Sequence, residues 1–234
     1  MPTLYLIPAP IADDALRSIP PQTADIARRL EVFIAERAKT ARHYIKALGP
    51  QKPLQELIVV EIPEDGTLGA AEAVFLDAIR SGKDVGLLSE AGCPGVADPG
   101  AALVALAHKA GVPVVPLVGP SSLLLALMAS GMNGQQFAFN GYLSPKRPEL
   151  ANDLRRLEQL VQRQHQTQLF IETPYRSQMV LEVALECLRP DTRFCVAQDL
   201  TGAQVFIRSL PVRDWQKLPP VALKKLPAVF LVGK

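Results

Sequence analysis

The chain has 234 residues, of which 48% are hydrophobic and 21% charged, a composition typical of a folded globular protein. This composition excludes a disordered, collagen-like or coiled-coil chain, and the length fits one large domain or two small ones. The formal net charge of +2 gives no field strong enough to indicate nucleic-acid or membrane binding by itself, although a local basic surface stays open.

The sequence shows no targeting or metal-binding signal. The N-terminal residues lack the basic region and apolar core of a signal peptide. The longest apolar run, 123–129, is far shorter than the roughly 20 residues that span a bilayer. Cys93, Cys187 and Cys195 form no C-x-x-C pair, so neither a disulfide framework nor a metal site is predicted. We therefore expect a cytoplasmic protein with no membrane partner.

Short apolar runs alternate with helical patterns in the first half of the chain. Strands are predicted at 4–7, 32–35, 57–62, 85–88 and 113–118, and helices at 40–48, 68–81 and 100–110. Almost every position of these strands is hydrophobic. This alternation predicts an α/β fold with a mostly parallel sheet that is covered on both faces.

In the second half of the chain, predicted strands and helices alternate less regularly. Helices are predicted at 121–130, 148–166 and 177–188, and strands at 137–143, 168–171, 194–198, 204–210 and 228–232. Fewer helices separate these strands, which favours a mixed, more antiparallel sheet. Prolines and a glycine in 116–120 interrupt both patterns, so we predict two α/β domains, 1–117 and 118–234.

The densest candidate site is the loop 89–100, which follows a buried strand and leads into a helix. Its sequence, SEAGCPGVADPG, holds three glycines and two prolines. It is longer than the about 2–6 residues of a plain connection, and ligands of open α/β sheets bind beyond the carboxyl ends of strands. Asp98 is predicted to cap the following helix, with Pro99 in its first turn. The alternative is a purely structural loop.

Four other strand ends carry polar residues. They are 34–36, followed by a basic helix over 37–46, then 119–122, 170–176 and 196–201. A serine at the start of the apolar helix after 118 is also an ordinary helix cap, and each of the other segments is equally compatible with loop filler. Their shared position at strand ends favours the functional interpretation.

Several common motifs are missing from the sequence. No G-x-G-x-x-G follows the first strand, and there is no Walker loop, G-x-S-x-G or H-E-x-x-H motif. His43, His108 and His165 are scattered and are predicted to lie on the surface. Cys93 has no nearby histidine that would indicate a nucleophile.

Taken together, these motifs resemble the tetrapyrrole-methylase-like class of S-adenosylmethionine-dependent methyltransferases. Within it, the chain resembles the branch that contains bacterial 16S ribosomal RNA ribose 2′-O-methyltransferases. Residues 89–100 match S-D-A-G-x-P-G-x-x-D-P-G with Glu90 in place of aspartate, and 119–122 match G-P-S-[AS]. Residues 126–131 match A-L-x-A-S-G, while 137–144 and 172–176 approximate F-x-F-x-G-F-L-P and E-S-P-H-R.

The resemblance implies two αβα domains with the cofactor, S-adenosylmethionine, in the cleft between them, usually in a homodimer. It also implies a set of cofactor-binding positions. These are Pro8, Ser89, Glu90, Ala91, Gly92, Ser121 and Ser122, and, in the second domain, Ile171, Ala197, Gln198, Pro227 and Ala228.

Three segments depart from the branch pattern. A-T-P-I-G-N is replaced by APIAD at 9–13, A-E-D-T-R-H by AERAKT at 35–40, and R-E-L-T-K by QDLTG at 198–202. The glutamate of the second motif is kept at Glu36. Cofactor binding is therefore expected to be retained and the chemistry toward the substrate to be altered.

If the methyl acceptor is a ribose hydroxyl, a carboxylate that removes its proton is expected nearby. Glu36 is the first candidate for this catalytic role and Asp98 the second, and helix capping is the alternative for both. The basic residues of 37–46 are candidates to meet a phosphate backbone, or else form a solvated helix face.

Three functions stay open at this point. The first is methylation of ribosomal RNA, on the ribose. The second is methylation of another acceptor, either a tetrapyrrole-like small molecule or a protein. The third is a non-catalytic module that binds S-adenosylmethionine, which the lost Asp, Arg and His of the A-E-D-T-R-H motif suggest.

Overall fold

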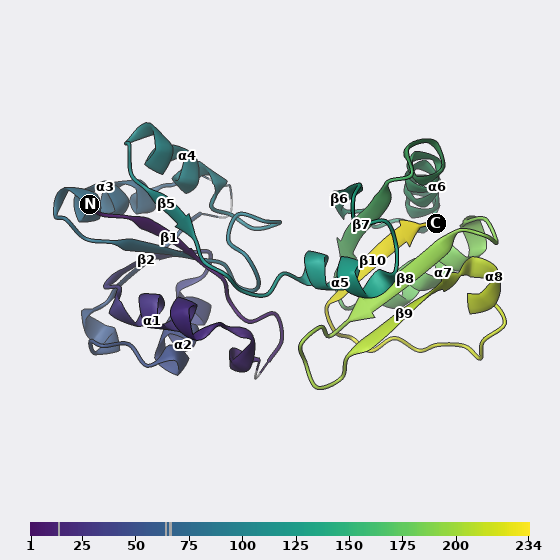
Figure 1. Cartoon of the computed structure of the whole chain (residues 1–234), viewed down its shortest axis with the longest axis horizontal. Coiled ribbons are helices and arrows are strands. Elements are labelled where there is room, and N and C mark those ends of the chain that lie inside the picture. The colour runs from purple at the N-terminus through teal and green to yellow at the C-terminus, as the bar shows by residue number, and fades with distance from the viewer. Residues whose placement is uncertain (14, 64, 66) are drawn as a thin grey trace. The chain divides into compact units, whose positions relative to one another are not determined.

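The computed structural model describes residues 1–13, 15–63, 65 and 67–234. The chain forms two compact units, Met1–Ser121 and Ser122–Lys234 (Figure 1). The boundary predicted from the sequence follows residue 117, and the units divide after Ser121. Each unit has its own sheet, its own helices and its own hydrophobic core.

The first unit contains a five-stranded parallel sheet in the order β3-β2-β4-β1-β5. The strands are β1 (Leu4–Ile7), β2 (Val32–Ala35), β3 (Ile58–Glu61), β4 (Val85–Leu88) and β5 (Val114–Pro116). The helices are α1 (Pro21–Arg29), α2 (Ala38–Leu48), α3 (Ala70–Arg80) and α4 (Ala101–Lys109), with short 3-10 helices at Leu16–Ser18 and Leu54–Glu56.

Both faces of this sheet are covered, as predicted. Side chains of successive strand residues point to opposite faces, so β2 divides its residues between two cores. Phe33 and Ala35 join the cluster formed with α1 and α2, and Val32 and Ile34 join the cluster formed with α3 and α4. Hydrophobic residues at every position of β2 therefore follow from burial on both sides.

The second unit contains a mixed five-stranded sheet in the order β6-β7-β10-β8-β9. Among the strand pairs that the structure describes in this sheet, β6 and β7 run parallel and the other pairs run antiparallel. The strands are β6 (Phe137–Tyr142), β7 (Thr167–Glu172), β8 (Arg193–Gln198), β9 (Phe206–Pro211) and β10 (Ala228–Gly233). The helices are α5 (Ser122–Ser130), α6 (Arg147–Gln164), α7 (Ser177–Cys187) and α8 (Val212–Trp215).

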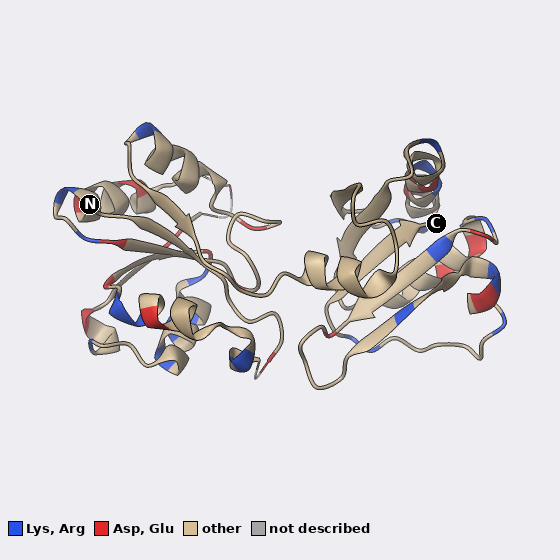
Figure 2. Cartoon of the chain, in the orientation of Figure 1, with Lys and Arg blue, Asp and Glu red and all other residues tan. Residues whose placement is uncertain are grey.

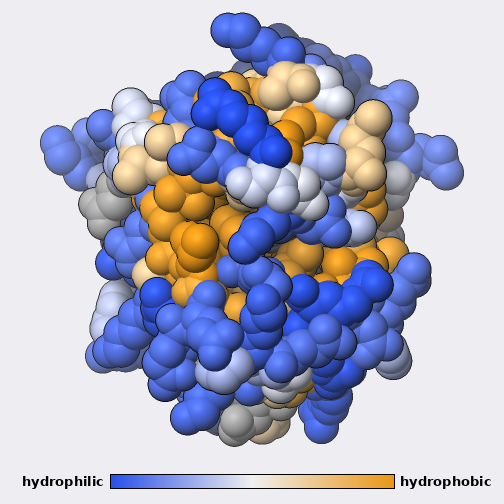
Figure 3. Space-filling model, turned by 90° about the vertical axis from the view of Figure 1, so that its left-hand side faces the viewer, coloured by the Kyte–Doolittle hydropathy of each residue, from blue (hydrophilic) through white to orange (hydrophobic). Residues whose placement is uncertain are grey.

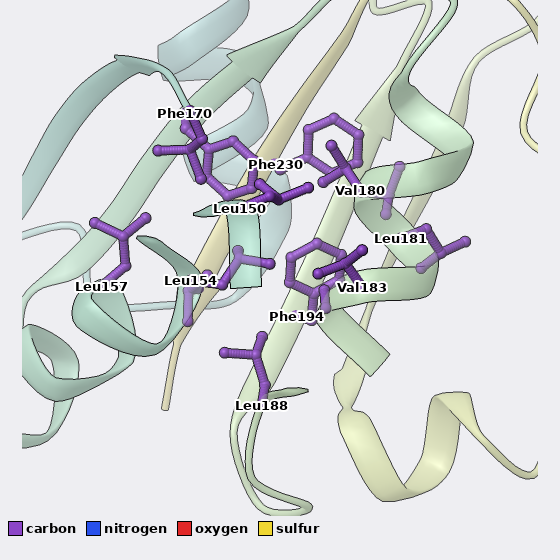
Figure 4. Packing of buried hydrophobic residues seen from close by; sticks show 14 of the residues in the cluster. Leu150, Leu154, Leu157, Phe170, Val180, Leu181, Val183, Leu188, Phe194 and Phe230 are labelled. Carbon is purple, nitrogen blue, oxygen red and sulfur yellow. The ribbon is translucent and has the colours of Figure 1, made fainter. Parts of the chain in front are cut away.

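Three phenylalanines form the centre of the second core, beneath α6 and α7 (Figure 4). The ring of Phe230 in β10 stacks on Phe170 in β7 at a centroid distance of 5.3 Å and on Phe194 in β8 at 6.0 Å. The single tryptophan, Trp215 in α8, is buried at the edge of this core, and its indole N–H donates to the carbonyl of Phe194 at 2.8 Å. Helix α5 contacts β8, β9 and β10.

The α/β class and the two-sheet architecture predicted from the sequence are confirmed, but two helices are missing from the prediction. Helix α1 buries Thr23, Ala24 and Ala27, and Ile26 is its one large apolar side chain, so the segment lacks the large hydrophobic residues that indicate a helix. Helix α8 is a single turn of four residues. The predicted strand 113–118 is too long, because β5 is an edge strand that ends at Pro116, a residue without a backbone N–H.

Hydrophobic surface is visible between hydrophilic side chains on the side shown in Figure 3. In the first unit, the edge strands β3 and β5 expose Ile58 and Val115. Isolated exposed apolar residues are normal for folded proteins and mark no site by themselves. Among the described helices, none combines the length and apolar character needed to cross a membrane.

We predict that Phe230→Ala destabilises the protein by about 3 to 5 kcal/mol, because it removes the ring between Phe170 and Phe194 and leaves a cavity. Phe137→Ala, in β6 of the same sheet but 42% exposed, is the matched control and is expected to cost far less. Urea unfolding measures both free energies. Equal losses for the two variants would contradict the central position of Phe230.

Candidate functional site

The first unit has its topological switch point between β1 and β4. These strands are neighbours in the sheet, but the chain leaves β1 through α1 toward β2 and leaves β4 through α4 toward β5, on the other side. Connections that diverge in this way open a crevice at the carboxyl ends of the strands, where ligands of open α/β sheets bind. Ile7, Leu88 and Ala35 are in register, so β1, β4 and β2 end together.

The loops that follow β1, β4 and β5 converge at this edge. Ala9 and Gly92 exchange backbone hydrogen bonds of 2.8 and 3.0 Å, and Gly92 has a φ of 74°. Gly119 approaches Pro8 so closely that a Cβ atom on Gly119 would lie 2.3 Å from the Cβ of Pro8. The close approach explains why glycine stands at 119, and it fixes the path of the chain just before Ser121.

A cavity of about 370 Å³ opens beside these loops. It is lined by the chain after β1, by one face of α2 and by the first residues after β4. The lining residues include Ala9, Pro10, Ala12, Thr40, His43, Tyr44, Ser89 and Glu90. The volume lies within the roughly 300–1,000 Å³ of small-molecule sites.

Three carboxylates gather at the same edge. Glu36 directly follows β2, and its Oε2 accepts a 3.2 Å hydrogen bond from the backbone N–H of Glu90. Glu90 accepts a 2.9 Å hydrogen bond from the Thr40 hydroxyl and lies 3.6 Å from Nε of Arg37. Asp98 is half-buried. Its burial, together with the charges of Glu36 and Glu90, raises its pKa to about 6, although a hydrogen bond with Ser89 acts to lower the pKa. Asp98 is thus a carboxylate that titrates near neutral pH.

The prediction that Asp98 caps the following helix is wrong. Helix α4 begins at Ala101, its N-cap residue is Gly100 with a φ of 132°, and no side chain caps it. A Cβ atom on Gly100 would lie 2.8 Å from Leu87, so the turn passes too close to β4 for a larger residue. Asp98 therefore does not cap the helix, and its carboxylate lies within the electrostatic influence of Glu36 and Glu90.

The predicted positions of the first unit occupy this edge. Pro8 and Ser89 are buried directly after β1 and β4, Glu90 and Ala91 are exposed, and Gly92 is buried. Ser121 is half-buried and is the last residue of the first unit, and Ser122 is the first residue of α5 in the second.

The predicted positions of the second unit lie together at one edge of its sheet. Ala228 at the start of β10 pairs with Gln198 at the end of β8 and with Glu172 at the end of β7. Ile171 and Ala197 both pair with Val229, one residue further along β10. Pro227 is exposed, and its carbonyl accepts a 3.0 Å hydrogen bond from Asp199.

Gln198 has a structural role as well. Its side chain is 2% exposed, and its amide donates to the carbonyls of Lys224 and Leu226 at 2.8 and 3.1 Å. Its carbonyl oxygen accepts from the N–H of Lys224 at 3.2 Å. Gln198 thereby fixes the segment that leads into β10.

The basic helix contributes less free positive charge than its sequence suggests. Arg37, just before α2, lies 3.6 Å from Glu90, whereas Lys39 and Lys46 are exposed. Basic and acidic residues are interspersed in both units (Figure 2). His43, His108 and His165 are exposed, as predicted.

Thr40 and Tyr44 belong to the site but were not predicted from the sequence. They lie one turn apart on α2, and the Tyr44 hydroxyl donates a 2.9 Å hydrogen bond to the carbonyl of Pro8. Burial raises the pKa of Tyr44, so the phenol stays neutral. The spacing of four residues places both on one helix face, which was the only available signal.

Comparisons with known proteins agree with this architecture. Residues 3–213 match the family described as Tetrapyrrole (Corrin/Porphyrin) Methylases. Ribosomal RNA small subunit methyltransferase I of Pseudomonas aeruginosa is 31% identical over 216 residues, covering 91% of this chain and 72% of the relative. The same-named protein of Bacillus subtilis is 30% identical over 209 residues, covering 89% and 67%.

A similar fold occurs among solved structures. The uroporphyrin-III C-methyltransferase of Thermus thermophilus has a TM-score of 0.55 and 19% identity, covering 100% of this chain and 92% of the other. A structure of that enzyme complexed with S-adenosylhomocysteine has a TM-score of 0.55 and 16% identity, covering 99% and 97%. At these identities the likeness shows the fold alone.

We predict that Asp98→Asn stabilises the protein at pH 7.5 by about 1 to 2 kcal/mol, after allowance for screening by solvent. The folded-state pKa of Asp98 is raised to about 6, so the charged form is disfavoured in the folded protein. The charged Asp98 carboxylate therefore lowers the free energy of unfolding fully at pH values above about 6, and this effect disappears as the pH falls toward 4.

Urea unfolding of both proteins between pH 4 and 8 measures this difference. Asp77→Asn, in α3 and fully on the surface beside Arg80, is the control that keeps wild-type behaviour. A stability difference between wild type and Asp98→Asn that stays constant with pH would contradict the raised pKa.

Proposed function

Because the chain belongs to the tetrapyrrole (corrin/porphyrin) methylase family, we propose that it transfers the methyl group of S-adenosylmethionine to a ribose hydroxyl of ribosomal RNA. The observation that carries this proposal is the similarity, over about nine-tenths of the chain, to relatives named ribosomal RNA small subunit methyltransferase I. The chain is an S-adenosylmethionine-dependent methyltransferase, and the identity of the acceptor is the proposed step.

The edge of the first unit suits this cofactor. When bound, S-adenosylmethionine supplies an electrophilic methyl group on a cationic sulfur, and it also carries an ammonium group. The cavity beside β1 and β4 is lined by small residues and by Glu90, and Glu36 and Asp98 add negative charge to the same edge. Carboxylates and small residues together fit a cationic ligand that approaches the backbone closely.

The proposed cofactor contacts are the residues identified from the sequence. They are Pro8, Ser89, Glu90, Ala91, Gly92 and Ser121 of the first unit, and Ser122, Ile171, Ala197, Gln198, Pro227 and Ala228 of the second. In the first unit, support comes from the convergence of the three loops at Pro8, Gly92 and Gly119. In the second, it comes from the shared register of β7, β8 and β10.

Two carboxylates are proposed to accept the proton of the ribose hydroxyl. Glu36 is held by the N–H of Glu90, which fixes one of its oxygens. Asp98 has a pKa of about 6, and a base with a raised pKa takes a proton more readily while staying ionised at neutral pH. The hydroxyl gives up a single proton, so Glu36 is the first candidate to take it and Asp98 the second, and the ionisation of Asp98 sets the pH dependence.

We further propose that the protein is a cytoplasmic homodimer. Helix α5 is apolar along its length and exposes Leu124 by 51% and Met128 by 78%. Large exposed apolar residues on one helix are typical of an interaction surface. A second copy of the chain is the proposed partner of this helix.

Cofactor binding is tested by calorimetric titration with S-adenosylmethionine and S-adenosylhomocysteine. We expect Ser121→Leu to weaken binding at least about tenfold, since a bulky side chain at the end of the converging loops displaces the ligand. Ser81→Leu is the control, because Ser81 lies before the amino end of β4, at the opposite edge of the sheet. Equal affinity of all three proteins would place the cofactor elsewhere.

Catalysis is tested with labelled S-adenosylmethionine and small-subunit ribosomal RNA. Glu36→Gln and Asp98→Asn are each expected to lower the rate about 100-fold or more, the usual contribution of a positioned acid or base. The wild-type rate is expected to rise with pH through about 6 as Asp98 ionises, and Asp98→Asn to lose that rise. Asp77→Asn serves as the surface control.

The acceptor atom is identified by alkaline hydrolysis of the product, because a 2′-O-methyl group protects the adjacent phosphodiester. Label in alkali-sensitive positions would identify a base as the acceptor and contradict the ribose. Label transferred to a porphyrin or to protein, but not to RNA, would favour the second function. Cofactor binding without transfer to any acceptor would favour a non-catalytic module.

A further inference from the structure

An exposed aromatic ring with a cation above it lies at the edge of the second unit that carries Gln198 and Ala228. Tyr175 follows β7 and is 80% exposed. The ammonium of Lys225 lies 5.6 Å from the centre of its ring. Lys225 belongs to the segment that leads into β10, and its neighbour Lys224 is also exposed.

The turn that carries Tyr175 is firmly held from beneath. Glu172, 4% exposed, accepts hydrogen bonds through Oε1 from the N–H of Thr173 at 2.6 Å and from Nε and Nη2 of Arg176 at 3.0 and 2.6 Å. These bonds tie both ends of the turn to one buried carboxylate. Tyr175 is therefore presented on a rigid support although its own side chain is in solvent.

The segment that carries the lysines is held by two glutamines. Gln178 of α7 accepts from the N–H of Leu223 at 2.9 Å. The buried amide of Gln198 donates to the carbonyls of Lys224 and Leu226 and accepts from the N–H of Lys224. Fixed backbone positions lower the entropy that a ligand must remove on binding. The backbone segments that carry the ring and the two cations are thus fixed on two separate supports.

The two lysines are available to an anion. In the described part of the chain neither forms an ion pair, and the ammonium of Lys224 donates to the side-chain oxygen of Gln204. A surface that offers an aromatic face beside cations matches an unpaired nucleotide, whose base stacks on the ring while its phosphates meet the ammonium groups.

We propose that Tyr175, Lys224 and Lys225 bind an unpaired nucleotide of the RNA substrate. The base stacks on the exposed part of the Tyr175 ring, and the lysines contact the flanking phosphates. This inference rests on the proposed function, because it takes RNA as the substrate. It assigns the recognition of single-stranded RNA to the edge of the second sheet rather than to the basic helix α2.

The test measures fluorescence anisotropy with a labelled, short single-stranded oligoribonucleotide and with an abasic oligonucleotide of the same length. Tyr175→Ala is expected to weaken binding of the first about 5- to 100-fold and to leave the abasic probe unchanged, because stacking needs a base. Tyr175→Phe is expected to bind as wild type does. Tyr142→Ala, at another exposed tyrosine in β6, is the matched control.

The combined change Lys224→Gln and Lys225→Gln is expected to weaken both probes. The slope of log affinity against log salt should fall by about 1.4, or about 0.7 for each phosphate contact on a single strand. Lys109→Gln, at the end of α4 in the first unit, is the matched control. Unchanged binding in the lysine variant would overturn the assignment.

The outcomes separate this inference from the proposed function. If wild type methylates ribosomal RNA and Tyr175→Ala binds the oligoribonucleotide equally well, the nucleotide site is refuted and the proposed function stands. If wild type binds the oligoribonucleotide with loss on Tyr175→Ala but methylates no RNA, the site stands and the proposed activity fails. Preference for a polyglutamate peptide over the oligoribonucleotide would identify an acidic protein partner and overturn the inference.

Discussion

The close contact between the chain segments that follow β1, β4 and β5 is the constraint on which the first unit's site depends. Gly119 passes over Pro8 with no room for a Cβ atom, and Ala9 and Gly92 join as a two-residue antiparallel bridge. These contacts are made by backbone and proline ring atoms, which have little freedom to move. The loops therefore have fixed positions at the sheet edge where the connections after β1 and β4 diverge.

In the second unit, buried polar side chains fix the segments at the edge of the sheet. Glu172 ends β7 and Gln198 ends β8, the two strands that flank β10. Glu172 accepts from the N–H of Thr173 and from the guanidinium of Arg176, and Gln198 bonds the backbone of Lys224 and Leu226. Buried polar groups that are hydrogen-bonded to a loop favour a single conformation of that loop. Such groups make the sheet edge rigid while the residues above it, including Tyr175 and Lys225, stay in water.

The sequence predicts the sheets well because their signal is local. The run 32–35 is hydrophobic at every position and 85–88 at every position except Gly86, a pattern typical of strands that are buried on both faces. Helix α1 is missing from the prediction because it buries small alanine and threonine side chains and has one large apolar residue, Ile26. The capping role predicted for Asp98 is wrong because an Asp-Pro-Gly sequence is typical of a helix start, whereas α4 begins only after Gly100 and has no side-chain cap. Contacts such as Tyr44 to Pro8 join residues 36 positions apart and leave no trace in local pattern.

The single tryptophan has a practical consequence. Trp215 is buried in the second unit and hydrogen-bonded to the carbonyl of Phe194, so tryptophan fluorescence, excited selectively, reports the folding of that unit and not of the first. Circular dichroism sees the helices of both units. If the fluorescence and circular dichroism transitions coincide during thermal unfolding, the two units unfold together. If they occur at different temperatures, the units unfold one after the other.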